Sequence, residues 1–125
     1  MNYNNTQAIF IQIVDLICER VLNEYYKPEE RSPSVRELAA EMQVNPNTVM
    51  RSYERLQNNG IIYNRRGIGY FFTHNAKDKI INMRHNQFIE ETLPAVFKEM
   101  ILLNVKLEDL IKAFNTFTNK TEQTM

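Results

Sequence analysis

The stretch SVRELAAEMQVNPNTVMRSYERLQNNG, residues 34–60, contains two helix starts in close succession. Ser34 is a favourable N-cap residue, and Glu37 follows it at the spacing of a capping box, in which each side chain binds the other residue's backbone N–H. Asn45 is a second favourable N-cap residue. It is followed by Pro46, which suits the first helical position because its missing N–H would be unpaired there in any case. The stretch therefore predicts two helices separated by a short turn.

The second of these helices is predicted to end at about Asn58, because Asn59 and Gly60 both tolerate the left-handed backbone of a helix C-terminus. Two helices joined by a turn of about four residues have the spacing of a helix-turn-helix. Upstream, residues 8–22 place apolar side chains three and four positions apart, which predicts an amphipathic helix. Residues 25–33 contain two prolines and are predicted to form an extended loop.

Two short runs of β-branched and aromatic residues follow the helix-turn-helix, Ile61–Tyr63 and Gly69–Phe72. They flank residues 64–68, a basic stretch that contains a glycine, so the whole segment predicts a β-hairpin with a basic tip. The order helix, helix, helix, hairpin is that of a winged helix. Residues 1–74 are therefore predicted to form a winged helix-turn-helix domain.

The remaining residues, 75–125, are predicted to form two helices and a polar tail. Pro94 is expected to kink or break the first helix near Glu91, since its ring clashes with the carbonyl four residues back. The second helix starts after Asn104 and frays from Thr118 onward. Apolar side chains form a heptad-like seam and an aromatic face at Ile89, Leu93, Val96, Met100, Leu103, Phe114 and Phe117. Two such helices cannot cover these side chains alone, so they pack either on the first helix or on a second copy of the chain. We interpret this part as a dimerisation region, and the fold class as mainly α with a small β-hairpin.

The chain has 125 residues, of which 43% are hydrophobic and 24% charged, and this composition predicts one small folded domain with a helical appendage rather than global disorder. The 15 Lys and Arg residues balance the 15 Asp and Glu residues, so net charge argues neither for nor against a nucleic acid or membrane partner. Cys18 is the only cysteine, which excludes an intramolecular disulfide, and we expect it to be a small buried side chain. Residues 1–5 lack the basic start of a signal peptide, and no apolar run approaches the roughly 20 residues of a membrane span. A soluble cytoplasmic protein is expected.

The second helix of the helix-turn-helix carries the most informative set of polar residues. At about 100° per residue, one face carries the side chains that the fold must bury, Val49, Tyr53 and Leu56. The opposite face carries Asn47, Arg51 and Arg55, with Thr48 at its edge. Asparagine can bind adenine, and arginine guanine, through paired hydrogen bonds in the major groove of DNA. The alternative is an ordinary solvated helix face.

The local charge favours the DNA interpretation over a solvated face. Between Asn45 and His74 there are four arginines and a single acid, Glu54, so this segment of a neutral protein carries a net charge of +3. A concentrated arginine surface attracts phosphate. Arg65 and Arg66 lie at the predicted hairpin tip. The alternative to phosphate binding there is that their charge only keeps an exposed turn soluble.

Arg36 lies just after the Ser34 cap, where the first helix of a helix-turn-helix crosses the DNA backbone. We expect Arg36 to contact phosphate, and Ser34 to serve as both cap and phosphate contact. The alternative for Arg36 is an ion pair with Glu37 or Glu41.

The sequence does not predict an enzyme. His74 and His85 are isolated, and each is expected to be a surface residue rather than a metal ligand. No serine or cysteine lies in a nucleophile motif, and the segment Gly67–Gly69 lacks the strand-to-helix context of a phosphate-binding loop. No cofactor and no metal are therefore expected.

Several motifs resemble the GntR family of bacterial transcription regulators: PSVRELA at residues 33–39, VNPNTV at 44–49, YERL at 53–56 and GII at 60–62. The segment RRGIGYF, residues 65–71, resembles the family's wing. The VNPNTV string and the short C-terminal part are similar to the YtrA subfamily, which has two dimerisation helices in place of a large effector domain. The resemblance implies a homodimer that binds a palindromic operator and usually represses, with genes for ABC transporters as frequent neighbours.

The resemblance also implies which residues contact or approach DNA: Arg36, Asn45, Asn47, Thr48, Arg51, Gly67 and Gly69. The chain departs from the family pattern at Ser32, where an apolar residue is usual, and at residues 25–27, which lack the usual glycines. Pro46 and Met50 replace arginines that many other subfamilies use on bases. The base preferences of those subfamilies therefore do not transfer to this chain.

The expected function is that of a sequence-specific regulator of transcription that binds double-stranded DNA, most often a repressor, and acts as a homodimer. The alternative is a winged-helix module for protein–protein interaction, in which the hairpin and the second helix of the helix-turn-helix dock a partner. A small-molecule effector would have to bind between helices at the dimer seam, and no cluster of residues marks such a site.

Overall fold

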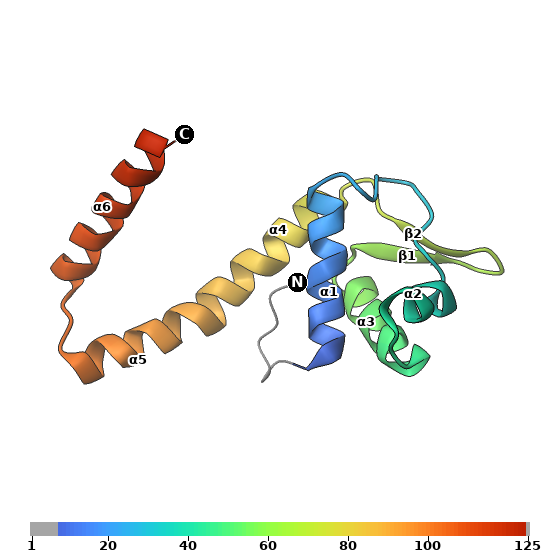
Figure 1. Ribbon diagram of the computed structural model, residues 1–125, viewed down its shortest axis with the longest axis horizontal. Coiled ribbons are helices and arrows are strands. Elements are labelled where there is room, and N and C mark those ends of the chain that lie inside the picture. Colours follow the sequence, from blue (N-terminus) through green and yellow to red (C-terminus); the bar gives the residue numbers. More distant parts are fainter. Residues whose placement is uncertain (1–7, 125) are drawn as a thin grey trace. The chain divides into compact units, whose positions relative to one another are not determined.

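The structure is a computed structural model and describes residues 8–124. The expectation that the chain lacks a signal peptide concerns residues 1–5, which lie outside the described range. Its elements, shown in Figure 1, are α1 (Ile9–Leu22), α2 (Val35–Met42), α3 (Pro46–Asn58), β1 (Ile62–Arg65), β2 (Gly69–Phe72), α4 (Ala76–Gln87), a π-helical turn η1 (Phe88–Thr92), α5 (Leu93–Leu103) and α6 (Leu107–Thr124). They form two compact units, one that ends at Arg84 and one that begins at His85. The predicted fold class, mainly α with a small β-hairpin, is confirmed.

The helix-turn-helix is capped as the sequence predicts. The Ser34 hydroxyl accepts a 3.0 Å hydrogen bond from the Glu37 backbone N–H, and the Glu37 carboxylate accepts one of 3.3 Å from the Ser34 N–H. The Asn45 side chain accepts a 2.8 Å bond from the Asn47 N–H, and Pro46 is the first residue of α3. These bonds satisfy N–H groups that have no partner within the helix itself. Both helix starts are therefore fixed by local side-chain chemistry.

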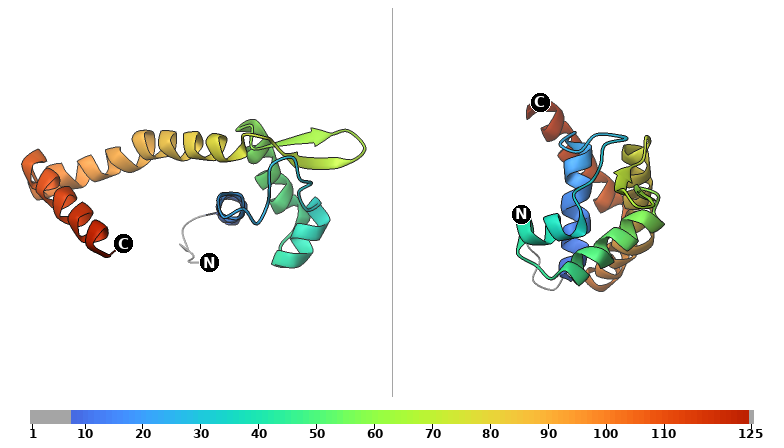
Figure 2. Two further views of the ribbon diagram at one scale, coloured as in Figure 1. Left: turned by 90° about the horizontal axis from the view of Figure 1, so that it is seen from above. Right: turned by 90° about the vertical axis from the view of Figure 1, so that its right-hand side faces the viewer.

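The wing is an antiparallel hairpin in which Ile62 pairs with Phe72 and Arg65 with Gly69. Its tip is shorter than predicted, because residues 64 and 65 belong to β1 and only residues 66–68 form the turn. A 2.9 Å hydrogen bond from the Ile68 N–H to the Arg65 carbonyl closes this turn, and Gly67 supplies the positive φ of 79° that it requires. The hairpin extends away from α1, α2 and α3 (Figures 1 and 2).

The loop predicted for residues 25–33 is joined to the wing by an isolated β-bridge and by backbone hydrogen bonds. Arg31 forms an antiparallel bridge with Phe71, and the Ser32 N–H donates a 2.9 Å bond to the Tyr70 carbonyl. The Phe72 N–H donates a 3.0 Å bond to the Glu30 carbonyl. The base of the hairpin is thus held to the chain segment that leads into α2.

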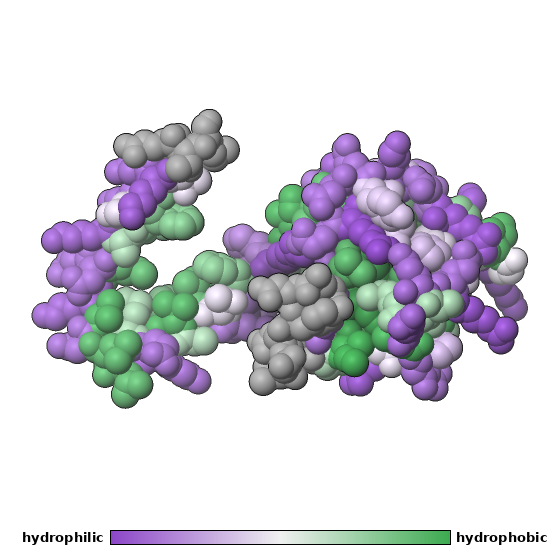
Figure 3. Space-filling view, viewed as in Figure 1, coloured by the Kyte–Doolittle hydropathy of each residue, from purple (hydrophilic) through white to green (hydrophobic). Residues whose placement is uncertain are grey.

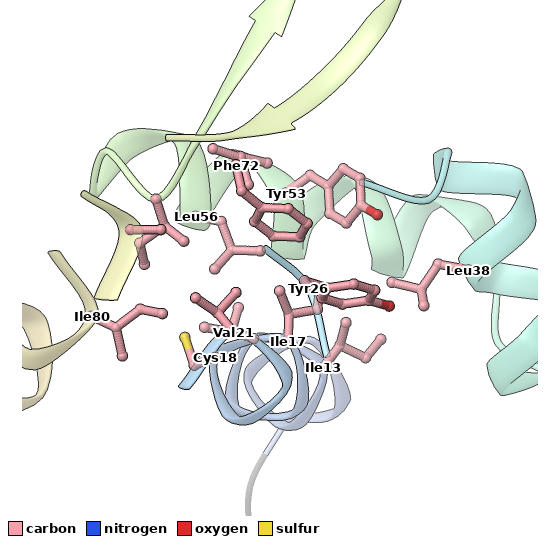
Figure 4. Close-up of a cluster of buried hydrophobic side chains, with 14 of the residues drawn as sticks. Ile13, Ile17, Cys18, Val21, Tyr26, Leu38, Tyr53, Leu56, Phe72 and Ile80 are labelled. Atoms are coloured by element: carbon pink, nitrogen blue, oxygen red, sulfur yellow. The ribbon is translucent and has the colours of Figure 1, made fainter. Parts of the chain in front are cut away.

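The core of the first unit lies between α1, α2, α3, the base of the wing and α4 (Figure 4). Cys18 is completely buried in it, as predicted, and burial raises the pKa of its thiol to about 12. Ala76, Ile80 and Met83 of α4 also belong to this core. The first compact unit therefore extends ten residues beyond the boundary expected at residue 74, because these side chains complete the winged helix rather than the region that follows.

The second unit has no buried side chain between residues 85 and 121. The break expected near Glu91 is the π-helical turn η1, after which Pro94 lies in the first turn of α5. Proline cannot donate to the carbonyl four residues back, and a π turn accommodates that missing bond without ending the helix. Asn104, with a φ of 54°, ends α5 as predicted.

The expectation of a frayed tail from Thr118 is wrong, because α6 continues to Thr124. The Thr118 hydroxyl donates to the Asn115 carbonyl at 2.9 Å, and the Thr121 hydroxyl to the Phe117 carbonyl at 3.0 Å. These bonds let the polar residues follow the helical backbone rather than compete with it. No helix among the described residues is long and apolar enough to cross a membrane.

Candidate nucleic-acid interface

Helix α3 presents one buried and one exposed face, as its periodicity predicts. Val49, Tyr53 and Leu56 are at most 1% exposed. Asn47 and Arg51 are exposed on the opposite side, together with the N-cap Asn45, while Thr48 and Arg55 are half-buried at its edge. The polar groups expected to reach DNA are therefore concentrated in the N-terminal half of α3.

The exposed face of α3 also contains Met50, which is 40% exposed. Met50 was not among the residues predicted to contact DNA, and was noted only as the replacement of an arginine. Its position three residues after Asn47 puts it near the same face, and that spacing is the signal that could have identified it. A methionine here offers an apolar surface of the kind that contacts thymine methyl groups in the major groove.

Arg51 is held against α1. Its guanidinium carbon lies 4.0 Å from the centroid of the Phe10 ring, within the range of a cation–π interaction. The neighbouring Ser52 is completely buried, and its hydroxyl donates a 2.8 Å hydrogen bond to the Phe10 carbonyl. Helical periodicity predicts that Arg51 lies on the exposed face. It cannot identify the contact with Phe10, which lies 41 positions earlier in the sequence.

Arg36 is exposed at the start of α2 and forms no ion pair with any residue that the structure describes. The two acids considered as its partners are engaged elsewhere. Glu37 closes the capping box, and hydrogen bonds from Ser34 lower the pKa of its carboxyl group. Glu41 pairs with Arg20 of α1 at 3.0 Å. The ion-pair alternative for Arg36 is therefore wrong, and its charge is free to meet a phosphate.

The wing adds further positive charge. Arg66 is exposed in the turn next to Gly67, and the guanidinium carbon of Arg65 lies 4.8 Å from the centre of the Phe71 ring. Gly69 has a φ of 141°, and a Cβ atom there would lie 3.1 Å from Nε of Arg31. The Arg31 side chain thus lies beside the start of β2, next to the turn of the wing. No sequence pattern marks this arginine as part of the site, because it lies in the irregular stretch before the helix-turn-helix.

Three ion pairs of the first unit lie outside this group of arginines. They join Arg20 to Glu41, Lys77 to Glu24 and Arg84 to Glu19. None involves the arginines of the irregular stretch, α2, α3 and the wing, which are Arg31, Arg36, Arg51, Arg55, Arg65 and Arg66. These six arginines therefore form no ion pair with a described residue, whereas Arg20 of α1 and Lys77 and Arg84 of α4 do.

The two histidines lie on the surface of the chain. His74 and His85 are both exposed, as expected. Across the residues that the structure describes, no three His, Cys, Asp or Glu side chains are grouped so as to hold a metal ion.

A second surface, on the unit that begins at His85, is apolar. Figure 3 shows hydrophobic side chains over α5 and the adjoining part of α6. Of the residues predicted for the seam and aromatic face, Leu93 and Met100 are half-buried, and the exposed ones are Ile89, Val96, Leu103, Phe114 and Phe117. The prediction missed Ile101 and Leu102, which are 82% and 76% exposed. They lie off the heptad spacing, so the apolar surface is wider than a single seam.

Comparisons with known proteins agree with this geometry. Residues 11–72, from α1 to the end of the wing, match the family described as bacterial regulatory proteins, gntR family. The chain is 33% identical over 116 residues to the uncharacterized HTH-type transcriptional regulator YhcF of Bacillus subtilis, covering 93% of this chain and 94% of that protein. It is 36% identical over 106 residues to the HTH-type transcriptional repressor YtrA of the same organism, covering 85% and 81% respectively. A crystal structure of a putative GntR-family regulator from Bacteroides thetaiotaomicron is 41% identical, with a TM-score of 0.77 over 91% of this chain and 99% of that one. The chain belongs to the GntR family of bacterial regulatory proteins and is a DNA-binding transcription regulator of the winged helix-turn-helix type.

Proposed function

We propose that this protein is a repressor that binds a palindromic operator as a homodimer in the cytoplasm. The observation that carries the proposal is that α3, the start of α2 and the wing carry arginines without an ion pair to a described residue, together with the exposed Asn47. Such a surface combines groups that bind phosphate with a group that can read a base edge.

The docking that we propose places α3 in the major groove with its N-terminal half deepest. Asn47 and Arg51 then meet base edges, and the exposed Met50 meets thymine methyl groups. Arg36, at the start of α2, lies where that helix crosses the backbone. Arg66 at the tip of the wing reaches the flanking phosphates or the minor groove.

The homodimer is supported by the second unit, which buries none of its described side chains on its own. An apolar groove of about 580 Å³ runs along α5 beside Val96, Met100 and Leu103. A second groove, lined by Phe88, Leu93, Leu110, Ile111 and Phe114, lies between the start of α5 and α6. Surfaces of this kind are normally covered by a partner. A second copy that covers them by two-fold symmetry presents two copies of α3, which explains a palindromic operator.

Repression is supported by the similarity to YtrA of Bacillus subtilis, which is named as a transcriptional repressor. The YtrA-like pattern of the sequence also supports an operator next to genes for an ABC transporter. The location of the selected sites in the genome tests that part of the proposal.

The function is tested by selection of DNA from a random pool with the purified wild-type protein. We expect a palindromic motif, a mobility shift on that motif, and less transcript in vitro from a promoter that contains it. An Asn47→Ala variant, which leaves the core and the arginines intact, should lose the motif but keep weak binding to any DNA. A pool with no enriched sequence would favour the protein-interaction alternative, and increased transcript would refute repression.

A further inference from the structure

Phe10, in the first turn of α1, provides a support for an arginine of the recognition surface. The guanidinium carbon of Arg51 lies 4.0 Å from the centre of the Phe10 ring. Phe10 is half-buried, whereas Arg51 is exposed. A cation above an aromatic face is attracted by the ring's electron density. This attraction gives an otherwise solvated side chain a preferred position.

The backbone at Phe10 is tied to α3. The buried hydroxyl of Ser52, the residue after Arg51, donates a 2.8 Å hydrogen bond to the Phe10 carbonyl. Two consecutive residues of α3 therefore contact the same residue of α1, one through its backbone and one through its ring. The contact with Phe10 thus restricts the Arg51 side chain, which would otherwise move freely in solvent.

Other arginines of the surface lack such a support. Arg36 and Arg66 are exposed and make no ring contact with any residue that the structure describes. Arg65 lies over Phe71, which belongs to the same hairpin. Arg51 is therefore the arginine of α3 that a different helix holds in place.

We infer that Phe10 is a positioning residue for DNA recognition and acts through Arg51. A free arginine loses rotamer freedom when it binds DNA, and that loss weakens binding. The Phe10 ring removes much of this freedom before DNA arrives and leaves the N–H groups of Arg51 to meet the DNA. This role rests on the proposed function, since it concerns the contact between α3 and an operator.

The test compares operator affinity in the full-length protein and three variants. Phe10→Leu removes the ring but keeps an apolar side chain, and Phe10→Tyr keeps the ring. The matched control is Tyr25→Leu, which removes the ring 5.2 Å from the Arg20 guanidinium carbon, away from α3. We expect Phe10→Leu to weaken binding by about fivefold per half-site. Phe10→Tyr and Tyr25→Leu should bind like the wild type.

The decisive measurement repeats Phe10→Leu in an Arg51→Ala background, where it should have no further effect on affinity. Circular dichroism confirms that each variant is folded at the temperature of the titration. Nuclear magnetic resonance of the free protein supplies a reading without DNA: the ring-current shift of the Arg51 side chain should disappear in Phe10→Leu and remain in Phe10→Tyr.

Two results would overturn the role of Phe10 alone: an equal loss of affinity from Phe10→Leu in both backgrounds, or a Phe10→Tyr variant as weak as Phe10→Leu. A wild-type protein that enriches no DNA would instead refute the proposed function, and the role of Phe10 with it.

Discussion

The hydroxyl of Tyr53 donates a 2.6 Å hydrogen bond to the carbonyl of Pro33. Tyr53 lies in α3 and is 1% exposed, and Pro33 directly precedes the capping box of α2. The bond joins the helix that we place in the major groove to the segment that fixes the start of its neighbour. The angle between the two helices therefore depends on a polar contact as well as on apolar packing.

Replacement of Tyr53 by phenylalanine should destabilise the protein by about 1 kcal/mol, because the Pro33 carbonyl loses the shorter of its two hydrogen bonds and keeps the 3.1 Å bond from the Ser32 hydroxyl, while the ring packing is retained. A decrease of about 5 °C in Tm is expected for a unit of this size.

Burial raises the pKa of Tyr53 from its ordinary value of 10.0 to about 12. The neutral hydroxyl therefore stabilises the fold below pH 10, and this contribution is lost as the pH rises from 10 to 12. Urea unfolding at pH 8 and pH 11 should show a smaller alkaline loss in Tyr53→Phe than in the wild type. An equal alkaline loss in both proteins would contradict the assignment.

Cys18 should be inert in the folded protein. Its pKa of about 12, against an ordinary 9.0, makes the reactive thiolate about a thousand times rarer at pH 8, since each pKa unit is a factor of ten. Labelling with a thiol reagent should therefore be slow in buffer and fast in urea. The control is Cys18→Ala, which should not be labelled in either condition. Rapid labelling of the native protein would show that the core around α1 opens readily.

Arg51 and Arg66 should differ in what they contribute to DNA binding. Loss of a base contact costs roughly 1–3 kcal/mol at its own base pair and reduces discrimination there, whereas loss of a phosphate contact weakens every sequence about equally. Arg51→Ala should therefore flatten the preference at one symmetric pair of operator positions. Arg66→Ala should lower specific and non-specific affinity together. Titration against the operator, its single-base variants and unrelated DNA makes the comparison. The reverse pattern would mean that the wing reads the sequence.

Binding should weaken steeply with salt, because each phosphate that an arginine neutralises releases a condensed counterion. For a dimer with a few such contacts per subunit, the slope of log affinity against log salt should be on the order of −4 to −8. Arg36→Ala should make this slope shallower, because Arg36 forms no ion pair with a described residue and its charge is therefore available to neutralise a phosphate. A flat response in the wild type would indicate a protein partner instead of DNA.

Ile101→Glu should disrupt the dimer that we propose. Ile101 is 82% exposed in the single chain, and burying a carboxylate without a partner costs several kcal/mol, so the dimer Kd should rise by at least about a hundredfold. Sedimentation of the full chain measures the change. The control is Lys98→Gln, which alters an exposed polar position on the same helix. A variant that remains a tight dimer would place the interface elsewhere.

The winged helix could be predicted from sequence because its determinants are local. The Ser34–Glu37 box and the Asn45–Pro46 pair each fix a helix start within four residues, and the resulting register decides that Tyr53 is buried. The basic character of the surface was equally visible, since four arginines fall within one short segment.

The features that sequence analysis missed depend on contacts between distant segments. The bridge between Arg31 and Phe71 joins a proline-flanked loop to the wing, and no local pattern marks it. Ala76 and Ile80 belong to the first core because of where α4 packs, not because of their spacing. The contact between Phe10 and Arg51 likewise links the first helix to the third. Side-chain periodicity describes faces, and it does not say which faces meet.

The separation of paired and unpaired arginines affects how the molecule approaches its target. The whole chain has a net charge of zero, so its total charge gives little long-range attraction to DNA. The ion pairs of Arg20, Lys77 and Arg84 nevertheless leave the surface of α3 and the wing positive. The charge of the first unit is therefore unevenly distributed, and the field of a polyanion exerts a torque on such a distribution. DNA would rotate the winged helix into the docking orientation during the encounter, at distances within the Debye length of about 8–10 Å in physiological salt.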